Sequence, residues 1–180
     1  MKTYTRFLIA SFMAVSMVAT AARAGAPTSE SAFGVGVRSH SLHSVFEELP
    51  YDDGDLSYGL AYEYHEGSAY WQLAVDYSTD ASRTNTVDTV ITPQLNLIFK
   101  DRFYRGGLGV LSSYITYSGD DPSLKDDWTD VYYQFLLGIS IPAGSLAIDV
   151  MAAYPFADWG DLGDFEAGDI EVQGWIKYLF

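Results

Sequence analysis

Eight separate segments of this chain alternate apolar and polar residues at every second position, and this pattern limits the possible folds more than any other feature. The segments cover residues 32–40, 55–65, 69–79, 86–100, 103–117, 130–141, 145–155 and 168–180. Period two is typical of a β-strand, because successive side chains point to opposite faces of a sheet. The sequence therefore predicts an all-β protein.

The connections between these segments alternate between two kinds. The links "EGS", "KDR" and "PAG" are short, whereas the links between them are longer and polar. In an up-and-down arrangement, this alternation places the short turns at one end and the long loops at the other. Outer-membrane barrels have short periplasmic turns and longer extracellular loops. We therefore predict an eight-stranded antiparallel up-and-down transmembrane β-barrel in the bacterial outer membrane.

Charge and aromatic residues follow the same division, which separates this prediction from a secreted β-sandwich or a lipocalin-like barrel. Most of the 24 acidic residues lie in or beside the long connections, and the whole chain has only 10 Lys and Arg. Tyr58 and Tyr77 lie near the long loops, whereas Tyr64 and Trp71 lie near a short turn. Aromatic side chains at both ends of an apolar face are expected at the level of lipid headgroups. The apolar faces are therefore predicted to contact lipid.

The first 24 residues have the layout of a secretory signal peptide. Lys2 and Arg6 precede an apolar run, and Ala22-Arg23-Ala24 supplies the small residues of a cleavage site. We predict a cleaved leader over 1–24 and a barrel over 25–180. The absence of cysteine from the sequence excludes a disulfide scaffold, and the formal net charge of -14 argues against nucleic acid as a partner.

The segment 103–117 breaks the alternation that the other segments keep. Leu108 and Val110 define one apolar face, but Leu111, Ile115 and Tyr117 fall on the other. A bulge near Ser112–Ser113 is expected to reconcile the two faces.

Three short stretches resemble the small eight-stranded outer-membrane proteins of Gram-negative bacteria, the group that contains the OmpA membrane domain, OmpX and OmpW. The stretches are "TPQLNLIFKDRFYRGGLGVLSSY", "SLKDDW" and the terminal "IKYLF". The resemblance implies contact with outer-membrane lipid and lipopolysaccharide. It also implies that Ile176, Tyr178 and Phe180 form the signal for the outer-membrane assembly machinery. OmpW-like proteins are thought to pass small apolar ligands through the barrel wall, which makes Pro93, inside a predicted strand, a candidate lateral gap.

Charged residues on the polar faces are predicted to fill the lumen, because an eight-stranded barrel has room inside only for side chains. A buried charge without a partner is costly. The first and last strands meet on closure, so we expect Arg38 to contact Glu171, with Asp76 and Asp149 nearby. A lower group should contain Glu63, Lys177 and Arg105. This polar network would act either as a structural plug or as a narrow path for a small solute.

The predicted role is non-enzymatic and needs no cofactor: envelope integrity, surface interaction or narrow transport of a small apolar solute. The alternative is a lipid A-modifying acylase or deacylase that uses His40 and His43 in "RSHSLHS" at the rim. Acidic loops such as Asp120–Asp127 can bind divalent cations, although clusters of acids are usually a solvated surface.

Overall fold

A computed structural model describes residues 31–41, 49–79, 81, 86–118 and 125–180. The predicted leader, His43 and part of the stretch Asp120–Asp127 lie outside the described residues. The strands are β1 (Ser31–Ser39), β2 (Leu56–Glu66), β3 (Ala69–Ser78), β4 (Val87–Lys100), β5 (Tyr104–Leu111), β6 (Tyr114–Tyr117), β7 (Asp127–Trp128), β8 (Tyr132–Ala143), β9 (Leu146–Phe156) and β10 (Glu171–Leu179), with two short 3₁₀ helices at Asp161–Asp164 and Ala167–Asp169.

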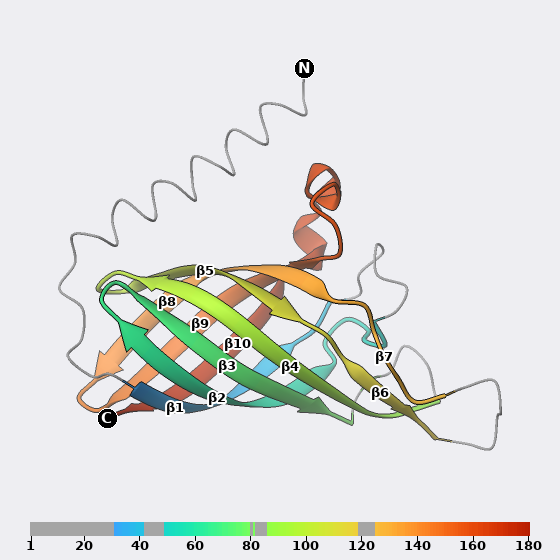
Figure 1. Ribbon diagram of the computed structural model, residues 1–180, viewed down its shortest axis with the longest axis horizontal. Coiled ribbons are helices and arrows are strands. Elements are labelled where there is room, and N and C mark those ends of the chain that lie inside the picture. Colours follow the sequence, from blue (N-terminus) through green and yellow to red (C-terminus); the bar gives the residue numbers. More distant parts are fainter. Residues whose placement is uncertain (1–30, 42–48, 80, 82–85, 119–124) are drawn as a thin grey trace.

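These elements close into an antiparallel barrel whose wall has eight strands, as predicted (Figure 1). β5 with β6, and β7 with β8, each act as one strand of the barrel, every strand pairs with the next along the chain, and β1 closes the ring by pairing with β10. The start of β1 and the chain end lie at the same end of the barrel as the short turns (Figure 1). Among the described residues, no helix has both the length and the apolar character needed to cross a membrane.

The barrel is apolar outside and polar inside, which is the reverse of a water-soluble protein. Leu60, Leu73 and Ile176 point outward and are more than half exposed, whereas Gln72 and Gln134 point inward and are fully buried. Because large apolar side chains exposed around the whole barrel are costly in water, this exterior fits hydrocarbon and rules out the secreted sandwich. Closure also satisfies the backbone groups that an open sheet edge would leave bare in lipid.

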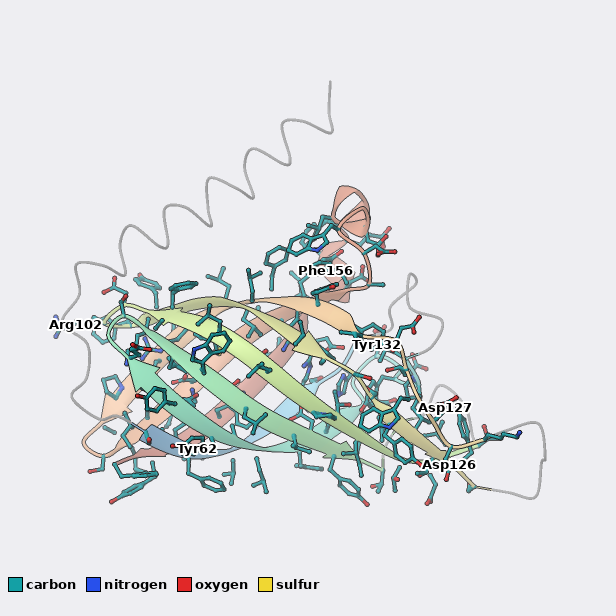
Figure 2. All side chains as sticks on the ribbon, in the orientation of Figure 1. Tyr62, Arg102, Asp126, Asp127, Tyr132 and Phe156 are labelled. Carbon is teal, nitrogen blue, oxygen red and sulfur yellow. The ribbon has the colours of Figure 1, made fainter. Side chains whose placement is uncertain are left out.

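The two ends of the barrel differ in their connections and their charge. Two of the short turns place Gly67 and Gly144 at positive φ, +58° and +68°, a conformation that side chains disfavour. Figure 2 shows Arg102 at this end and Asp126 and Asp127 at the opposite end. The asymmetry matches periplasmic turns and extracellular loops.

The bulge predicted near Ser112–Ser113 is wrong. The register of β4 with β5 continues without a shift into its pairing with β6, from Gln94–Leu111 to Ile91–Tyr114. Leu111 and Ile115 keep the same parity and point into the barrel. They can do so because one part of the upper lumen, the half away from the short turns, is apolar. There Leu49 and Tyr51, from the β1–β2 connection, pack against them, together with Val90 and Tyr132.

Candidate functional site

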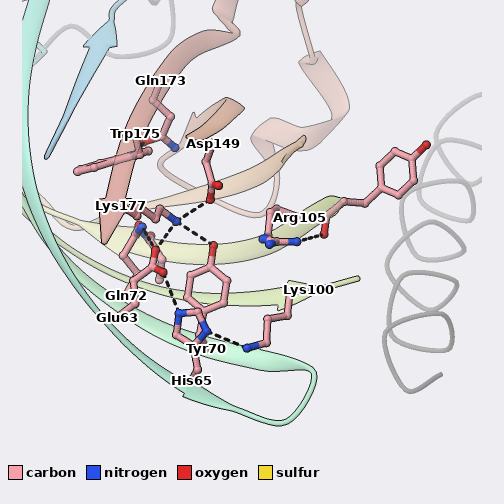
Figure 3. A network of polar contacts seen from close by, with 12 residues as sticks. Glu63, His65, Tyr70, Gln72, Lys100, Arg105, Asp149, Gln173, Trp175 and Lys177 are labelled. Carbon is pink, nitrogen blue, oxygen red and sulfur yellow. Dashed lines mark hydrogen bonds and ion pairs between the residues drawn. The ribbon is translucent and has the colours of Figure 1, made fainter. Parts of the chain in front are cut away.

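The half of the lumen on the side of the short turns, the lower half, is organised around the ammonium group of Lys177 (Figure 3). Its Nζ contacts a carboxylate oxygen of Glu63 and lies 2.6 Å from Oδ2 of Asp149. Nζ also lies 5.1 Å from the centre of the Tyr70 ring. One ammonium group therefore contacts two carboxylates in a site where all of these side chains are buried.

Two of the seven predicted network residues differ from their expected partners. Asp149 pairs with Lys177 and not with the Arg38 group, because it lies opposite Trp175 in the β9–β10 register, four residues along β10 from Glu171. Arg105 points inward but donates to the backbone carbonyls of Asp101, at 2.7 Å, and Tyr104, at 2.9 Å. Its place at the start of β5 puts these turn carbonyls within reach before any carboxylate.

His65 and Lys100, which the sequence reading missed, join the lower group instead. Nε2 of His65 lies 2.9 Å from Glu63, and its Nδ1 lies 2.8 Å from Nζ of Lys100. His65 follows Glu63 by two residues on β2 and therefore has the same parity. The shared parity with Glu63 would therefore have been enough to predict that His65 points into the lumen.

The predicted contact between Arg38 and Glu171 is present in the upper lumen. The Arg38 guanidinium also donates to Oε1 of Gln134 at 3.2 Å. Asp76 accepts a hydrogen bond from Gln94 and lines the same small cavity as Arg38 and Glu171. Both charged side chains of the pair are buried, so each satisfies the other.

Amide side chains connect the two charged groups into one network that spans the lumen. Gln72 donates to Glu63 at 2.9 Å, Asn96 donates to Gln72 at 2.9 Å, and Gln134 donates to Asn96 at 2.8 Å. Gln134 then accepts from Arg38, which completes the path. Carboxamides hold fixed donor and acceptor positions, so this connection adds rigidity and carries no charge.

Trp175 lies against the inner face of the barrel wall, over Gly36 of β1 and Gly59 of β2. A Cβ atom built on Gly36 or Gly59 would lie 2.5 Å or 2.7 Å from its indole ring, so only glycine fits beneath it. The indole Nε1 donates to Oε1 of Gln173 at 3.0 Å. The indole also packs against the buried Ala61 and Ala74 on the neighbouring strands.

His40, which was predicted at the rim, is buried inside the mouth. Its Nδ1 lies 3.1 Å from Oε1 of Glu171, and its Nε2 lies 2.9 Å from Oγ of Ser57. Its ring stacks on Tyr51, with centroids 3.6 Å apart and planes 2° from parallel. Burial raises the pKa of the Tyr51 phenol, so this ring stays neutral above the histidine.

Pro93 lies on the outer face of β4, in the middle of the wall. Its missing N–H leaves the pairing with Ser112 one long hydrogen bond, from Ser112 N to Pro93 O at 3.5 Å. Regular pairing resumes on both sides, at Gln94–Leu111 and Ile91–Tyr114.

For the metal hypothesis, no group of three or more His, Asp or Glu in the described part of the chain is placed to hold an ion.

The inside-out polarity, the closed eight-stranded wall and the filled lumen define an integral β-barrel protein of the bacterial outer membrane. No protein-family model matches the sequence, and no curated protein matches it. Among solved structures, the fold is similar to Neisserial surface protein A (NspA), with a TM-score of 0.53 and 10% identity over 83% of this chain and 96% of that one. Ail, the attachment invasion locus protein of Yersinia pestis, aligns with a TM-score of 0.44 and 14% identity over 84% of this chain and 99% of that one.

Proposed function

We propose that this protein is a closed outer-membrane barrel that acts through its extracellular surface and contributes to the integrity of the envelope. The observation that carries the proposal is the filled lumen. Trp175 and the two ion-pair groups occupy the interior, and Leu49 and Tyr51 occupy the mouth. A continuous path for a hydrated solute would require several buried, mutually satisfied side chains to move together.

The extracellular loop between β9 and β10 supports a role at the membrane surface. It stands outside the barrel wall (Figure 1), and its Trp159 packs against the outward-facing Phe156 and Phe135, with ring centroids 5.2 and 6.2 Å apart. Trp159 and Phe165 remain about half exposed. Aromatic rings of this kind favour the headgroup region, where one side is apolar and the other is wet.

Conductance of the refolded barrel in planar lipid bilayers tests the closed lumen. We expect no sustained channels from the wild-type protein and brief openings from Trp175→Ala, which removes a large buried side chain from the interior. Trp159→Ala is the matched control, because it removes an indole from the outer loop. Sustained open channels in the wild-type protein would overturn the proposal.

The acidic extracellular end is proposed to meet lipopolysaccharide through divalent cations, which bridge carboxylates and phosphates. Thermal unfolding in bilayers that contain lipopolysaccharide should shift upward with Mg²⁺, and Asp126→Asn with Asp127→Asn should reduce the shift. Asp101→Asn, at the opposite end of the barrel, is the control. An equal Mg²⁺ shift in both variants would contradict this contact.

Narrow transport of a small apolar solute is the second candidate, favoured by the apolar part of the upper lumen and the interrupted pairing at Pro93. It requires an apolar molecule to displace Leu49 and Tyr51 from their contacts with Leu111. Saturable binding of the apolar dye N-phenyl-1-naphthylamine to the folded barrel, lost in Leu111→Gln, would favour transport. The surface role predicts no saturable binding.

The proposed assembly signal, Ile176, Tyr178 and Phe180, lies exposed on the outer face of the chain end, where the assembly machinery can reach it.

A further inference from the structure

Three buried side chains in the mouth of the barrel, Ser57, His40 and Glu171, are joined by hydrogen bonds that the proposed surface role does not require. His40 lies between Ser57 and Glu171, with Nε2 2.9 Å from the serine hydroxyl and Nδ1 3.1 Å from the carboxylate. The three residues come from the end of β1, from β2 and from β10. They are brought together because β1 pairs with β2 on one side and with β10 on the other.

The positions of the protons follow from the partners. An ionised carboxylate can only accept hydrogen bonds, so Nδ1 of His40 must donate to Glu171. Nε2 is then the acceptor in a neutral ring, and the Ser57 hydroxyl must donate to it. Arg38 holds the other oxygen of Glu171 and thereby keeps the carboxylate charged and oriented. This is the tautomer in which histidine activates a serine for nucleophilic attack.

The cavity beside this group is about the size of one water molecule, so an acyl group fits only after side chains have moved. The cavity beside His40 and Glu171 is lined by the apolar side chains of Leu49, Leu111 and Pro155 on one part of its surface and by Arg38 and Thr92 on another. Leu49 and Tyr51 cover the cavity, and Ser57 is 1% exposed. A substrate therefore needs these two covering side chains to move aside.

We propose that Ser57, His40 and Glu171 form a hydrolytic centre for small carboxylic esters, with Ser57 as nucleophile, His40 as general base and Glu171 as the residue that positions the base. The Ser57 oxygen attacks the ester carbonyl carbon while its proton passes to Nε2 of His40. The carbon–oxygen bond to the alcohol breaks, and the alcohol leaves with that proton. Water then attacks the acyl-serine by the same route, so ester and water yield acid and alcohol.

An alkyl fluorophosphonate, which forms a covalent adduct with activated serine, tests this centre on the folded barrel in detergent. We expect a single adduct in the intact mass, mapped to Ser57, and no adduct in Ser57→Ala. Ser113→Ala, which alters a buried serine that lines the cavity, should react like the wild-type protein. His40→Gln should slow the reaction at least about 100-fold, because a general base typically contributes that much.

Tyr51→Ala should speed the labelling of Ser57 by uncovering the cavity. For hydrolysis of p-nitrophenyl acetate, Glu171→Gln should lower kcat and leave KM unchanged, because this carboxylate orients the base and does not touch the ester. All rates are compared on the heat-modifiable, folded fraction in gels, so loss of folding is not counted as loss of reactivity. Absence of a Ser57 adduct in both the wild-type protein and Tyr51→Ala, or labelling that is independent of His40, would overturn the proposal.

Discussion

Replacing Lys177 with methionine should lower the free energy of unfolding by about 3–5 kcal/mol, the usual cost of removing one partner from a buried ion pair. The side chain contacts two carboxylates, Glu63 and Asp149, and all three are at most 3% exposed. Methionine keeps most of the volume and the contact with the Tyr70 ring, so the loss is electrostatic. Both carboxylates then lie in the lumen without their ammonium partner.

The structure predicts how this cost divides between the two acids. Glu63 keeps hydrogen bonds from Gln72 and His65, each 2.9 Å long. Asp149 has no such support, since its other oxygen, Oδ1, is buried without a hydrogen-bond partner among the described residues. Most of the cost should therefore fall on Asp149. Adding Asp149→Asn to Lys177→Met should recover more stability than adding Glu63→Gln.

Urea unfolding of the barrel from lipid vesicles, followed by tryptophan fluorescence, measures these differences. Lys125→Met is the control, because Lys125 is an exposed residue of an extracellular loop and its removal should change stability by less than about 0.5 kcal/mol. A Lys177→Met variant within about 1 kcal/mol of the wild type would refute the argument. A larger recovery from Glu63→Gln than from Asp149→Asn would refute the division between the acids.

Two further substitutions test the packing of the wall and the lumen in the same unfolding assay. Gly36→Ala should lower the free energy of unfolding by about 1–3 kcal/mol, because the added methyl group overlaps the Trp175 indole. Gly160→Ala, whose added methyl group meets nothing within 4 Å, should be close to neutral. Equal effects of the two substitutions would contradict the close packing of Gly36 against Trp175. Pro93→Thr should raise stability by about 1 kcal/mol, because a new N–H can pair with the carbonyl of Ser112, and a loss of stability would show that the proline contributes by other means.

The strands and the direction of their faces could be predicted from the sequence because both depend on local alternation. Each wall strand begins and ends within a few residues of its predicted segment. Parity along one strand separates Glu171 and Lys177, which are buried in the lumen, from Val172 and Ile176, which are more than half exposed on the outer face. The contact between Arg38 and Glu171 could also be predicted, because closure of any such barrel brings the first and last strands together.

The error at Ser112–Ser113 shows where this reasoning fails. It assumed one polarity for the whole interior, so apolar Leu111 and Ile115 seemed to require a bulge. One part of the upper lumen is apolar, and there Leu49 and Tyr51, from a connection between strands, pack against Leu111 and Ile115. Alternation within a strand carries no information about a loop that returns to cover it.

By itself, then, the sequence determined an eight-stranded barrel with a lipid-facing exterior, because alternation and turn chemistry act over a few residues. The tertiary structure alone decided which buried groups meet. It paired Asp149 with Lys177, and it placed His40 between Ser57 and Glu171, which are 17 and 131 residues away from it along the chain. These contacts depend on the register between neighbouring strands and on the stagger of the closed ring, and a shift of two residues would keep every side chain on its face while changing every partner.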